Sequence, residues 1–134
     1  MRPVRHAAAL CLTGVLASVS MAACGSSSYP ELCTLAADAR ALAATVDKQT
    51  SSGTYDKVAL AARVDQLSDR ANQLSKPLAS ASDLVDDLTN LSNAASNVAT
   101  DIKGGFSGTA LPSDKQDLAD LGDFARTLHG DASC

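Results

Sequence analysis

Apolar side chains recur every three or four positions in four separate stretches between residues 30 and 134. This spacing is the period of one face of an α-helix, and almost no segment alternates as a strand would. The four stripes are Leu32, Leu35, Ala39, Leu42 and Val46; Leu60, Val64, Leu67, Ala71, Leu74 and Leu78; Leu84, Leu88, Leu91, Ala95, Val98 and Ile102; and Leu118, Leu121, Ala125 and Leu128. The sequence therefore predicts an all-α fold in which each helix needs neighbours to bury its stripe.

The expected helix ends carry the usual local signals. Pro30 stands in the first turn of the first helix, where its missing N–H costs nothing. Residues 50–53 (Thr-Ser-Ser-Gly) break that helix, and residues 103–105 (Lys-Gly-Gly) end the third. Ser113 followed by Gln116 has the spacing of a capping box for the fourth.

Pro77 leaves two arrangements open. It can end the second helix, with Ser80 or Ser82 capping the third, which gives an up-down-up-down bundle of about four helices. Alternatively, the second and third helices form one long kinked rod, with the first and fourth packed on its two halves.

Residues 1–23 have the composition of a secretory signal peptide. Arg2 and Arg5 precede an uncharged run from residue 7 to 19, and small residues follow. The run is shorter than the roughly 20 residues of a membrane span. Residues 25–28 (Gly-Ser-Ser-Ser) are typical of a flexible tether, so we expect a tether over residues 24–29 and a helical domain over 30–134.

Met21-Ala22-Ala23-Cys24 resembles the lipobox of bacterial lipoproteins, with Met where Leu is usual. This resemblance covers residues 1–24 only. It implies cleavage before Cys24, a lipid on the Cys24 thiol, and an anchor in the cell membrane on its extracytoplasmic face. The alternative is ordinary secretion, with cleavage after Ala22 or Ala23 and an unmodified Cys24.

The cysteine count fits a lipidated Cys24. Cys11 lies in the signal segment, so lipidation of Cys24 leaves Cys33 and Cys134 as an even pair. Outside the cytoplasm such a pair is expected to form a disulfide, and both arrangements at Pro77 are compatible with it.

Charge and composition exclude nucleic-acid binding. The chain has a formal net charge of −4 and only 3% aromatic residues. It therefore offers neither a positively charged surface for the phosphate backbone nor enough aromatic side chains for nucleobases to stack on. Without residues 1–23 the basic residues fall to nine against fifteen acidic ones, a charge of −6.

Residues 24–134 contain few groups for catalysis or metal binding. They have one Glu, Glu31, and one His, His129, which is expected simply to favour the end of the last helix. The residues of di-iron, zinc and EF-hand sites are missing, and residues 104–108 (Gly-Gly-Phe-Ser-Gly) lack the nucleophile-elbow pattern. The sequence predicts no enzyme, no cofactor and no metal.

A few polar and aromatic residues are candidate partner contacts. Asn90, Asn93 and Asn97 share one stripe of the third expected helix, which is either a contact face or a solvated one. Phe106 lies with Leu111 in the longest loop, either as an exposed anchor or as a cover for the end of the core, and Tyr55 lies at the same end of a bundle.

These features predict a binding or scaffolding module at the cell envelope. Its partners would be the membrane, through the lipid, and an envelope protein or cell-wall component that the sequence leaves unidentified, as it does the oligomeric state. The alternative is a carrier that holds a lipid or other apolar ligand within the helical bundle.

Overall fold

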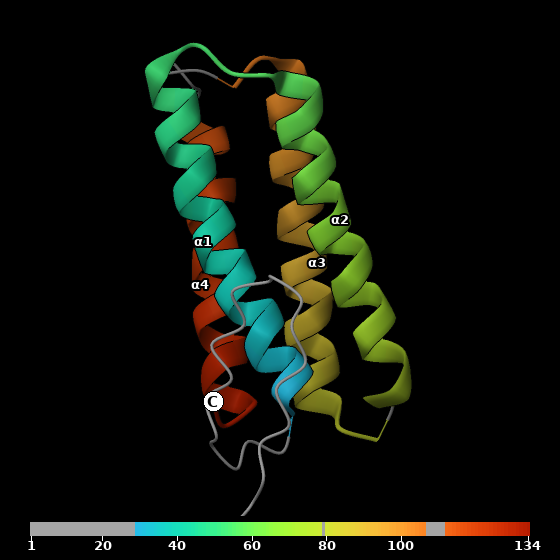
Figure 1. Ribbon diagram of the computed structural model, residues 1–134. Helices are drawn as coiled ribbons and strands as arrows, with labels where there is room; N and C mark the ends of the chain where they lie inside the picture. The colour runs from blue at the N-terminus through green and yellow to red at the C-terminus, as the bar shows by residue number, and fades with distance from the viewer. Residues whose placement is uncertain (1–28, 79, 107–111) are drawn as a thin grey trace, which may run out of the picture.

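The computed structural model describes residues 29–78, 80–106 and 112–134, which form four α-helices and one short 3-10 helix. The helices are α1 (Pro30–Ser52), α2 (Lys57–Ser75), α3 (Ser82–Gly104) and α4 (Pro112–Asp131), with η1 (Lys76–Leu78) between α2 and α3. They run alternately up and down, and Figure 1 shows α1 and α2 in front of α4 and α3. The prediction of an all-α bundle is confirmed.

Each helix packs on two neighbours around the bundle. α1 packs on α4, α4 on α3 and α3 on α2, and the contact that closes the ring, between α1 and α2, is the least extensive of the four. Side-chain hydrogen bonds join α2 to α3: Ser68 Oγ lies 3.1 Å from the carbonyl oxygen and 2.8 Å from the hydroxyl oxygen of Ser92, and Lys103 Nζ donates to Asp65 Oδ2 at 2.8 Å.

The core is made of the predicted stripes. Every residue of the first, third and fourth stripes is buried, and fully buried alanines such as Ala36, Ala39 and Ala95 bring the helices close together. In the second stripe Leu60, Val64, Leu67 and Ala71 are buried, but Leu74 and Leu78 are only partly covered. The lower part of α2 diverges from α1 in Figure 1, so its last leucines lack a facing helix.

Pro77 separates α2 from α3, and the kinked-rod alternative is wrong. A proline cannot donate the backbone hydrogen bond of a continuing helix, and η1 turns the chain at this point. The chain then reverses direction, so that α3 runs antiparallel to α2 (Figure 1).

The serine caps predicted for the third and fourth helices are also wrong. α3 begins after Ala81, which makes no side-chain cap, so neither Ser80 nor Ser82 caps it. α4 begins at Pro112, which places Ser113 inside the helix. Gln116 Nε2 donates to Asp120 Oδ1 at 2.6 Å instead of reaching back to a capping residue. Pro at the first helical position is itself a strong start signal, and it overrides the serine that follows.

The other helix ends follow the sequence signals. Pro30 stands at the start of α1, and Gly53 and Gly105 follow α1 and α3 with φ of 72° and 108°. These are left-handed conformations that glycine adopts without steric cost. Asp56 caps α2 by accepting a hydrogen bond from the Ala59 N–H at 3.0 Å.

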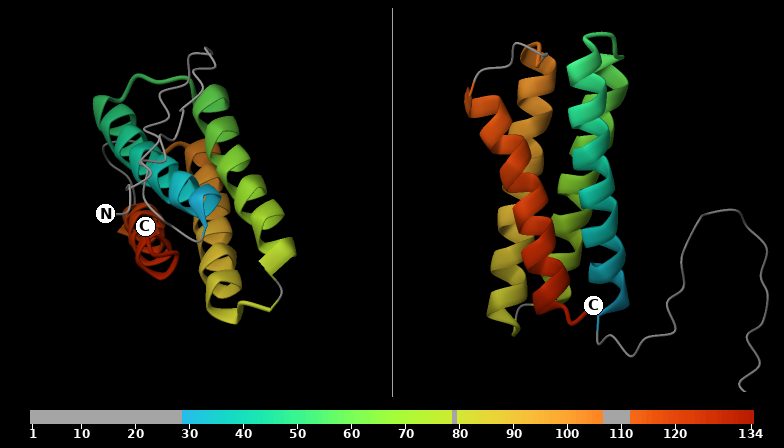
Figure 2. Two further views of the ribbon diagram at one scale, coloured as in Figure 1. Left: turned by 60° about the horizontal axis from the view of Figure 1, so that its bottom comes forward. Right: turned by 90° about the vertical axis from the view of Figure 1, so that its left-hand side faces the viewer.

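A disulfide joins Cys33 in the first turn of α1 to Cys134 just after α4, with a Cα–Cα distance of 5.6 Å. Both ends of the helical domain therefore lie at one end of the bundle, as the right-hand view of Figure 2 shows. The connection between α1 and α2, which contains Tyr55, lies at the opposite end (Figure 1).

Candidate functional site

The three candidate asparagines form an exposed stripe on α3. Asn90, Asn93 and Asn97 are all exposed, and their side chains make no hydrogen bond to other described residues. Asp86, one turn earlier, is exposed as well. The stripe faces away from the Leu84–Leu88–Leu91 side of α3, which packs in the core. The structure thus presents amide and carboxylate groups together on one outer face, and this surface is called the asparagine face below.

The two aromatic candidates are covered. Phe106 is 4% exposed and belongs to the core, so its side chain closes this end of the bundle and offers no exposed anchor. Tyr55 packs partly against the core, its hydroxyl is buried without a hydrogen-bond partner, and burial raises its pKa. Leu111 lies outside the described residues. Of the two readings of Phe106, the structure supports the cover for the end of the core, because the core takes up its ring.

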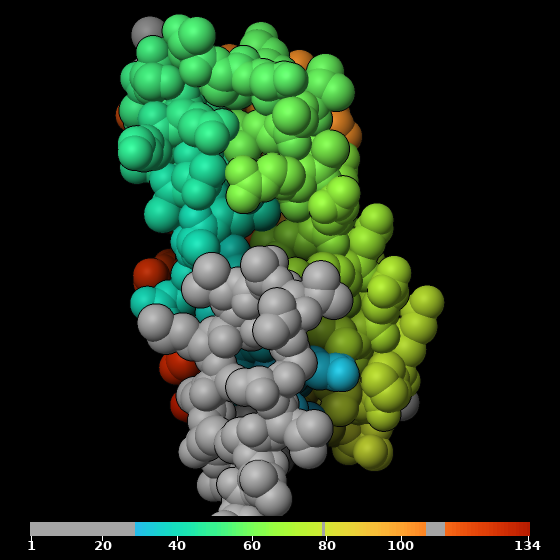
Figure 3. All heavy atoms as spheres, in the orientation of Figure 1, coloured from blue at the N-terminus to red at the C-terminus, as the bar shows by residue number. Residues whose placement is uncertain are grey.

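A groove lies between α1 and α2, where the bundle is least tightly packed. Figure 3 shows the upper part of this face, where α1 and α2 form the surface. One part of the groove has a volume of about 260 Å³ and is lined by Asp38, Ala41, Leu42, Thr45, Arg63, Gln66, Leu67 and Arg70. The adjoining part is lined by Glu31, Thr34, Arg70, Gln73 and Leu74. These residues define the α1–α2 groove.

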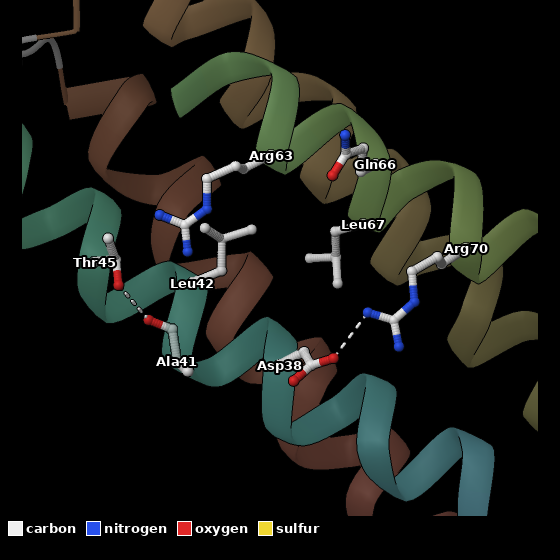
Figure 4. Close-up of a pocket in the computed structure, with 8 residues that line it drawn as sticks. All are labelled: Asp38, Ala41, Leu42, Thr45, Arg63, Gln66, Leu67 and Arg70. Atoms are coloured by element: carbon white, nitrogen blue, oxygen red, sulfur yellow. Dashed lines mark hydrogen bonds and ion pairs between the residues drawn. The ribbon is translucent and has the colours of Figure 1, made fainter. Parts of the chain in front are cut away.

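In the α1–α2 groove, charged side chains of both signs lie above buried leucines. Leu42 and Leu67 are buried core residues whose side chains face each other between the helices (Figure 4). Arg63 and Arg70 both reach from α2 toward α1. Arg70 Nη1 donates to Asp38 Oδ2 at 2.8 Å, whereas the exposed Arg63 makes no hydrogen bond or ion pair with another described residue.

The negative charge of the protein is concentrated on the other half of the bundle. Helices α3 and α4 hold nine aspartates and three basic residues, a net charge of −6. The segment from α1 through η1 holds six acidic and six basic residues and is neutral. The α1–α2 groove therefore lies on the side of the molecule that does not repel anions.

Two carboxyl pairs bridge α3 and α4. Burial is the main reason that the pKa of Asp87 is raised to about 6, and a hydrogen bond to Asp131 together with the charges of Asp131, Asp83 and Asp86 adds to the effect. Asp101 has its pKa raised to about 6 in the same way, by burial and then by Asp114 and Asp117. Oδ2 of Asp87 and of Asp101 is buried and has no hydrogen-bond partner in the structure, so we expect each carboxyl group to hold a proton and to share it with its acidic neighbour on α4.

These pairs predict that stability falls as the pH rises. Asp87 and Asp101 bind a proton more tightly in the folded chain than in the unfolded chain, because the pKa of each is raised from its ordinary value of 3.8 to about 6. The stability they contribute is fully present below the ordinary value and is lost as the pH rises through about 6. We expect the melting temperature to drop by a few degrees between pH 4.5 and pH 7.5 because of these groups.

Asp87→Asn and Asp101→Asn test this expectation. Asparagine donates a hydrogen bond to the facing carboxylate at any pH, so each variant should melt at a higher temperature than the parent at pH 7.5 and depend less on pH. Asp47→Asn, at an exposed aspartate of α1, is the matched control. Thermal melts followed by circular dichroism give the answer, and a parent protein that is most stable above pH 7 would contradict the shared protons.

The remaining predictions from the sequence concern a metal site, a membrane span, His129 and Cys24. Among the described residues, no group of three or more His, Cys, Asp or Glu side chains could hold a metal ion. Within the same ranges, no helix has the length and apolar character to cross a membrane. His129 is exposed in the last turn of α4. Cys24 and the whole signal segment lie outside the described residues.

No protein-family model, curated protein or solved structure matches the chain.

Sequence reasoning missed the α1–α2 groove and the carboxyl pairs. Arg63 and Arg70 are seven residues apart, which places them on one face of a helix, and this signal was available. What the sequence does not contain is the divergence of α2 from α1, which opens the space between them. The partners of Asp87 and Asp101 lie on another helix, so their pairing depends on how α3 and α4 are aligned.

Proposed function

We propose that this protein is a lipid-anchored, extracytoplasmic module that binds or scaffolds an envelope protein or a cell-wall component, without catalysis. The lipid would be carried by Cys24, at the end of the signal segment. The observation that carries the proposal is the division of the cysteines outside that segment. Cys24 stands in the lipobox-like motif, and the two others, Cys33 and Cys134, are bonded to each other. Such a bond is typical of oxidising compartments outside the cytoplasm.

The position of Cys24 would hold the bundle close to the membrane. Helix α1 begins at Pro30, six residues after Cys24, and six extended residues span at most about 20 Å. The end that carries the disulfide would then face the membrane. The connection between α1 and α2 would face away, because 23 residues of helix extend about 35 Å.

The asparagine face is the surface that best suits a polar partner. Its amides donate and accept hydrogen bonds, and they lie on the acidic half of the bundle beside Asp86. A partner with hydroxyl, amide or basic groups would complement this surface. Helix α3 runs from the disulfide end toward the far end of the bundle (Figure 1). The exposed asparagine face would then lie along the side of the bundle, accessible to a partner above the membrane.

Photocrosslinking in intact cells tests the partner surface. A photoreactive amino acid at position 93 of the full chain should give a reproducible adduct, and the same amino acid at Ala119, an exposed position on α4, should not. Replacing the neighbouring Asn90 and Asn97 by Ala should reduce the adduct about tenfold, because each lost hydrogen bond costs about 0.5–1.5 kcal/mol. Equal adducts from positions 93 and 119, or an adduct indifferent to the two alanines, would contradict a partner on this face.

A second candidate function, a carrier of an apolar ligand, is favoured by one specific observation. One part of the α1–α2 groove is lined by Leu74, which is only partly buried, so an apolar ligand lying there could cover its exposed surface.

A further inference from the structure

We propose that the first two turns of α4, Pro112–Asp117, form a pH-controlled clasp. The clasp packs on α3 under mildly acidic conditions and separates from it at neutral pH, while the rest of the bundle stays folded. The controlling group is Asp101 of α3, which faces Asp114 and Asp117 of α4 across the interface. This inference goes beyond the proposed function, because it concerns a change of conformation and names no partner.

No apolar side chain anchors the clasp. None of the residues Pro112–Asp117 is buried, and the first core residue of α4 is Leu118, which at 9% is the most exposed member of the core. Asp114 and Asp117 are the partly buried residues of the clasp, so its contact with α3 depends on carboxyl groups. A segment with so few buried apolar contacts opens locally at low cost, and a helix end without packing frays.

The other end of α4 is held far more firmly. Leu128 and Ala132 are fully buried there, and a disulfide joins Cys134 to α1. In the right-hand view of Figure 2 this end lies beside the start of α1, and the clasp lies at the opposite end of the bundle. Ionisation of Asp87 beside Asp131 therefore acts on a helix end that a covalent bond retains.

Asp101 meets only acidic groups across the interface. Its Oδ2 is buried without a hydrogen-bond partner, and burial, followed by Asp114 and Asp117, raises the pKa of Asp101 to about 6. A negative charge on Asp114 suits the first turn of α4, because the N-terminus of a helix favours anions. The proton therefore belongs to Asp101, and its loss places like charges on both sides of the interface.

The cations at this end of the bundle do not neutralise Asp101. Lys103 donates to Asp65 at 2.8 Å and is thus turned toward α2. Lys57 of α2 lies beside the glycine that follows α3, where it complements the negative end of that helix. Lys115, within the clasp, is exposed and makes no hydrogen bond or ion pair with another described residue. The short helix η1, which also contacts α3, lies at the opposite end (Figure 1).

The raised pKa of Asp101 sets the direction of the effect. Asp101 binds its proton more tightly in the closed clasp than in the open one, where its pKa returns to the ordinary 3.8. Closure is therefore favoured most below the ordinary value and is lost as the pH rises through about 6. With these two values, the ratio of open to closed clasp increases about tenfold between about pH 5 and pH 7.5.

Opening would change the end of the bundle opposite the disulfide. It would uncover Leu118 and the side of α3 that carries Asp101. In the orientation proposed above, this end faces away from the membrane, so the acidity outside the cell would alter the surface that a partner meets. Only this consequence rests on the proposed function, and the clasp itself does not.

Hydrogen exchange followed by NMR tests the clasp in the purified full chain. The amides of Gln116 and Leu118 donate to carbonyl groups of the clasp, four residues earlier in the helix, whereas Ala125 reports the middle of α4. Protection is corrected for the intrinsic pH dependence of exchange. We expect protection at Gln116 and Leu118 to fall about tenfold from pH 5 to pH 7.5, and protection at Ala125 to fall much less.

Two matched variants locate the controlling group. Asp101→Asn keeps a hydrogen-bond donor toward Asp114 and Asp117 at any pH, so the clasp amides should be protected as well at pH 7.5 as at pH 5. Asp87→Asn makes the same replacement at the disulfide end and should leave the tenfold loss in the clasp unchanged. Misfolding cannot produce the gain of protection at pH 7.5 that is expected of Asp101→Asn.

Three kinds of result would overturn the proposal. Equal protection of the clasp amides at the two pH values would show that ionisation does not control closure. An equal loss at Ala125 would show that the whole bundle is destabilised and not the clasp alone. A pH response that persists in Asp101→Asn, or that disappears in Asp87→Asn, would place the controlling group elsewhere.

Discussion

Reduction of the Cys33–Cys134 disulfide is expected to lower the melting temperature by about 15 °C or more. The bond closes a loop with a sequence separation of 101 residues, for which chain entropy gives a stabilisation of about 4–5 kcal/mol. One kcal/mol corresponds to roughly 4–8 °C for a domain of this size. The bond also ties the first turn of α1 to the segment after the last turn of α4, and helix ends fray unless they are held in place.

The core of this bundle makes the disulfide important. Many of its buried positions are alanines, among them Ala36, Ala39, Ala61, Ala95 and Ala99, and each buries little apolar surface. A small domain with such a core depends more on a covalent link than a larger one does.

Thermal melts with and without reducing agent measure this effect. Cys134→Ser should melt at the temperature of the reduced parent, and reducing agent should leave the variant unchanged. A parent protein whose melting temperature does not respond to reduction would show that the bond is unformed or contributes nothing.

The fold was predictable because local periodicity and the required burial agree. Leu84, Leu88 and Leu91 recur at helical spacing and all are buried in α3. The turn at Pro77 was left open between two arrangements, since the stripe of α2 continues past it nearly in register. Burial decided it: a long rod would leave half of each stripe uncovered, whereas the bundle covers almost all of them.

The details that failed depend on contacts between helices. Leu74 and Leu78 fit the stripe of α2 as well as Leu67 does, yet they are only partly buried because α2 diverges from α1. Phe106 was left open between an exposed anchor and a cover for the end of the core, and the structure places it in the core. The α1–α2 groove follows from the same divergence, so no pattern within a single helix could predict its depth.

The exposure of the asparagine face was predictable because it depends on the geometry of one helix and not on contacts between helices. Asn90, Asn93 and Asn97 lie about 200° around α3 from its leucines, and burying the leucines exposes the amides. Helical geometry alone fixes this placement once the leucine stripe is known.

Replacement of Cys24 by Ser is expected to move the protein from the membrane fraction to the soluble fraction. The described residues contain no helix that could span a membrane, and the chain outside the signal segment carries a net charge of −6, which anionic lipids repel. Two or more acyl chains at Cys24 would be needed for stable attachment, because a single chain binds only reversibly. The disulfide and the helical fold of the variant should be unchanged.

The most direct test of lipid anchoring is the intact mass of the protein extracted from membranes. The account predicts a chain that starts at Cys24, carries a diacylglycerol group there, and has Cys33 and Cys134 oxidised. Treatment with a lipase that cleaves the esters should remove the acyl mass and release the protein. A chain cleaved after residue 22 or 23 without acyl groups, or an uncleaved chain with reduced cysteines, would contradict the account.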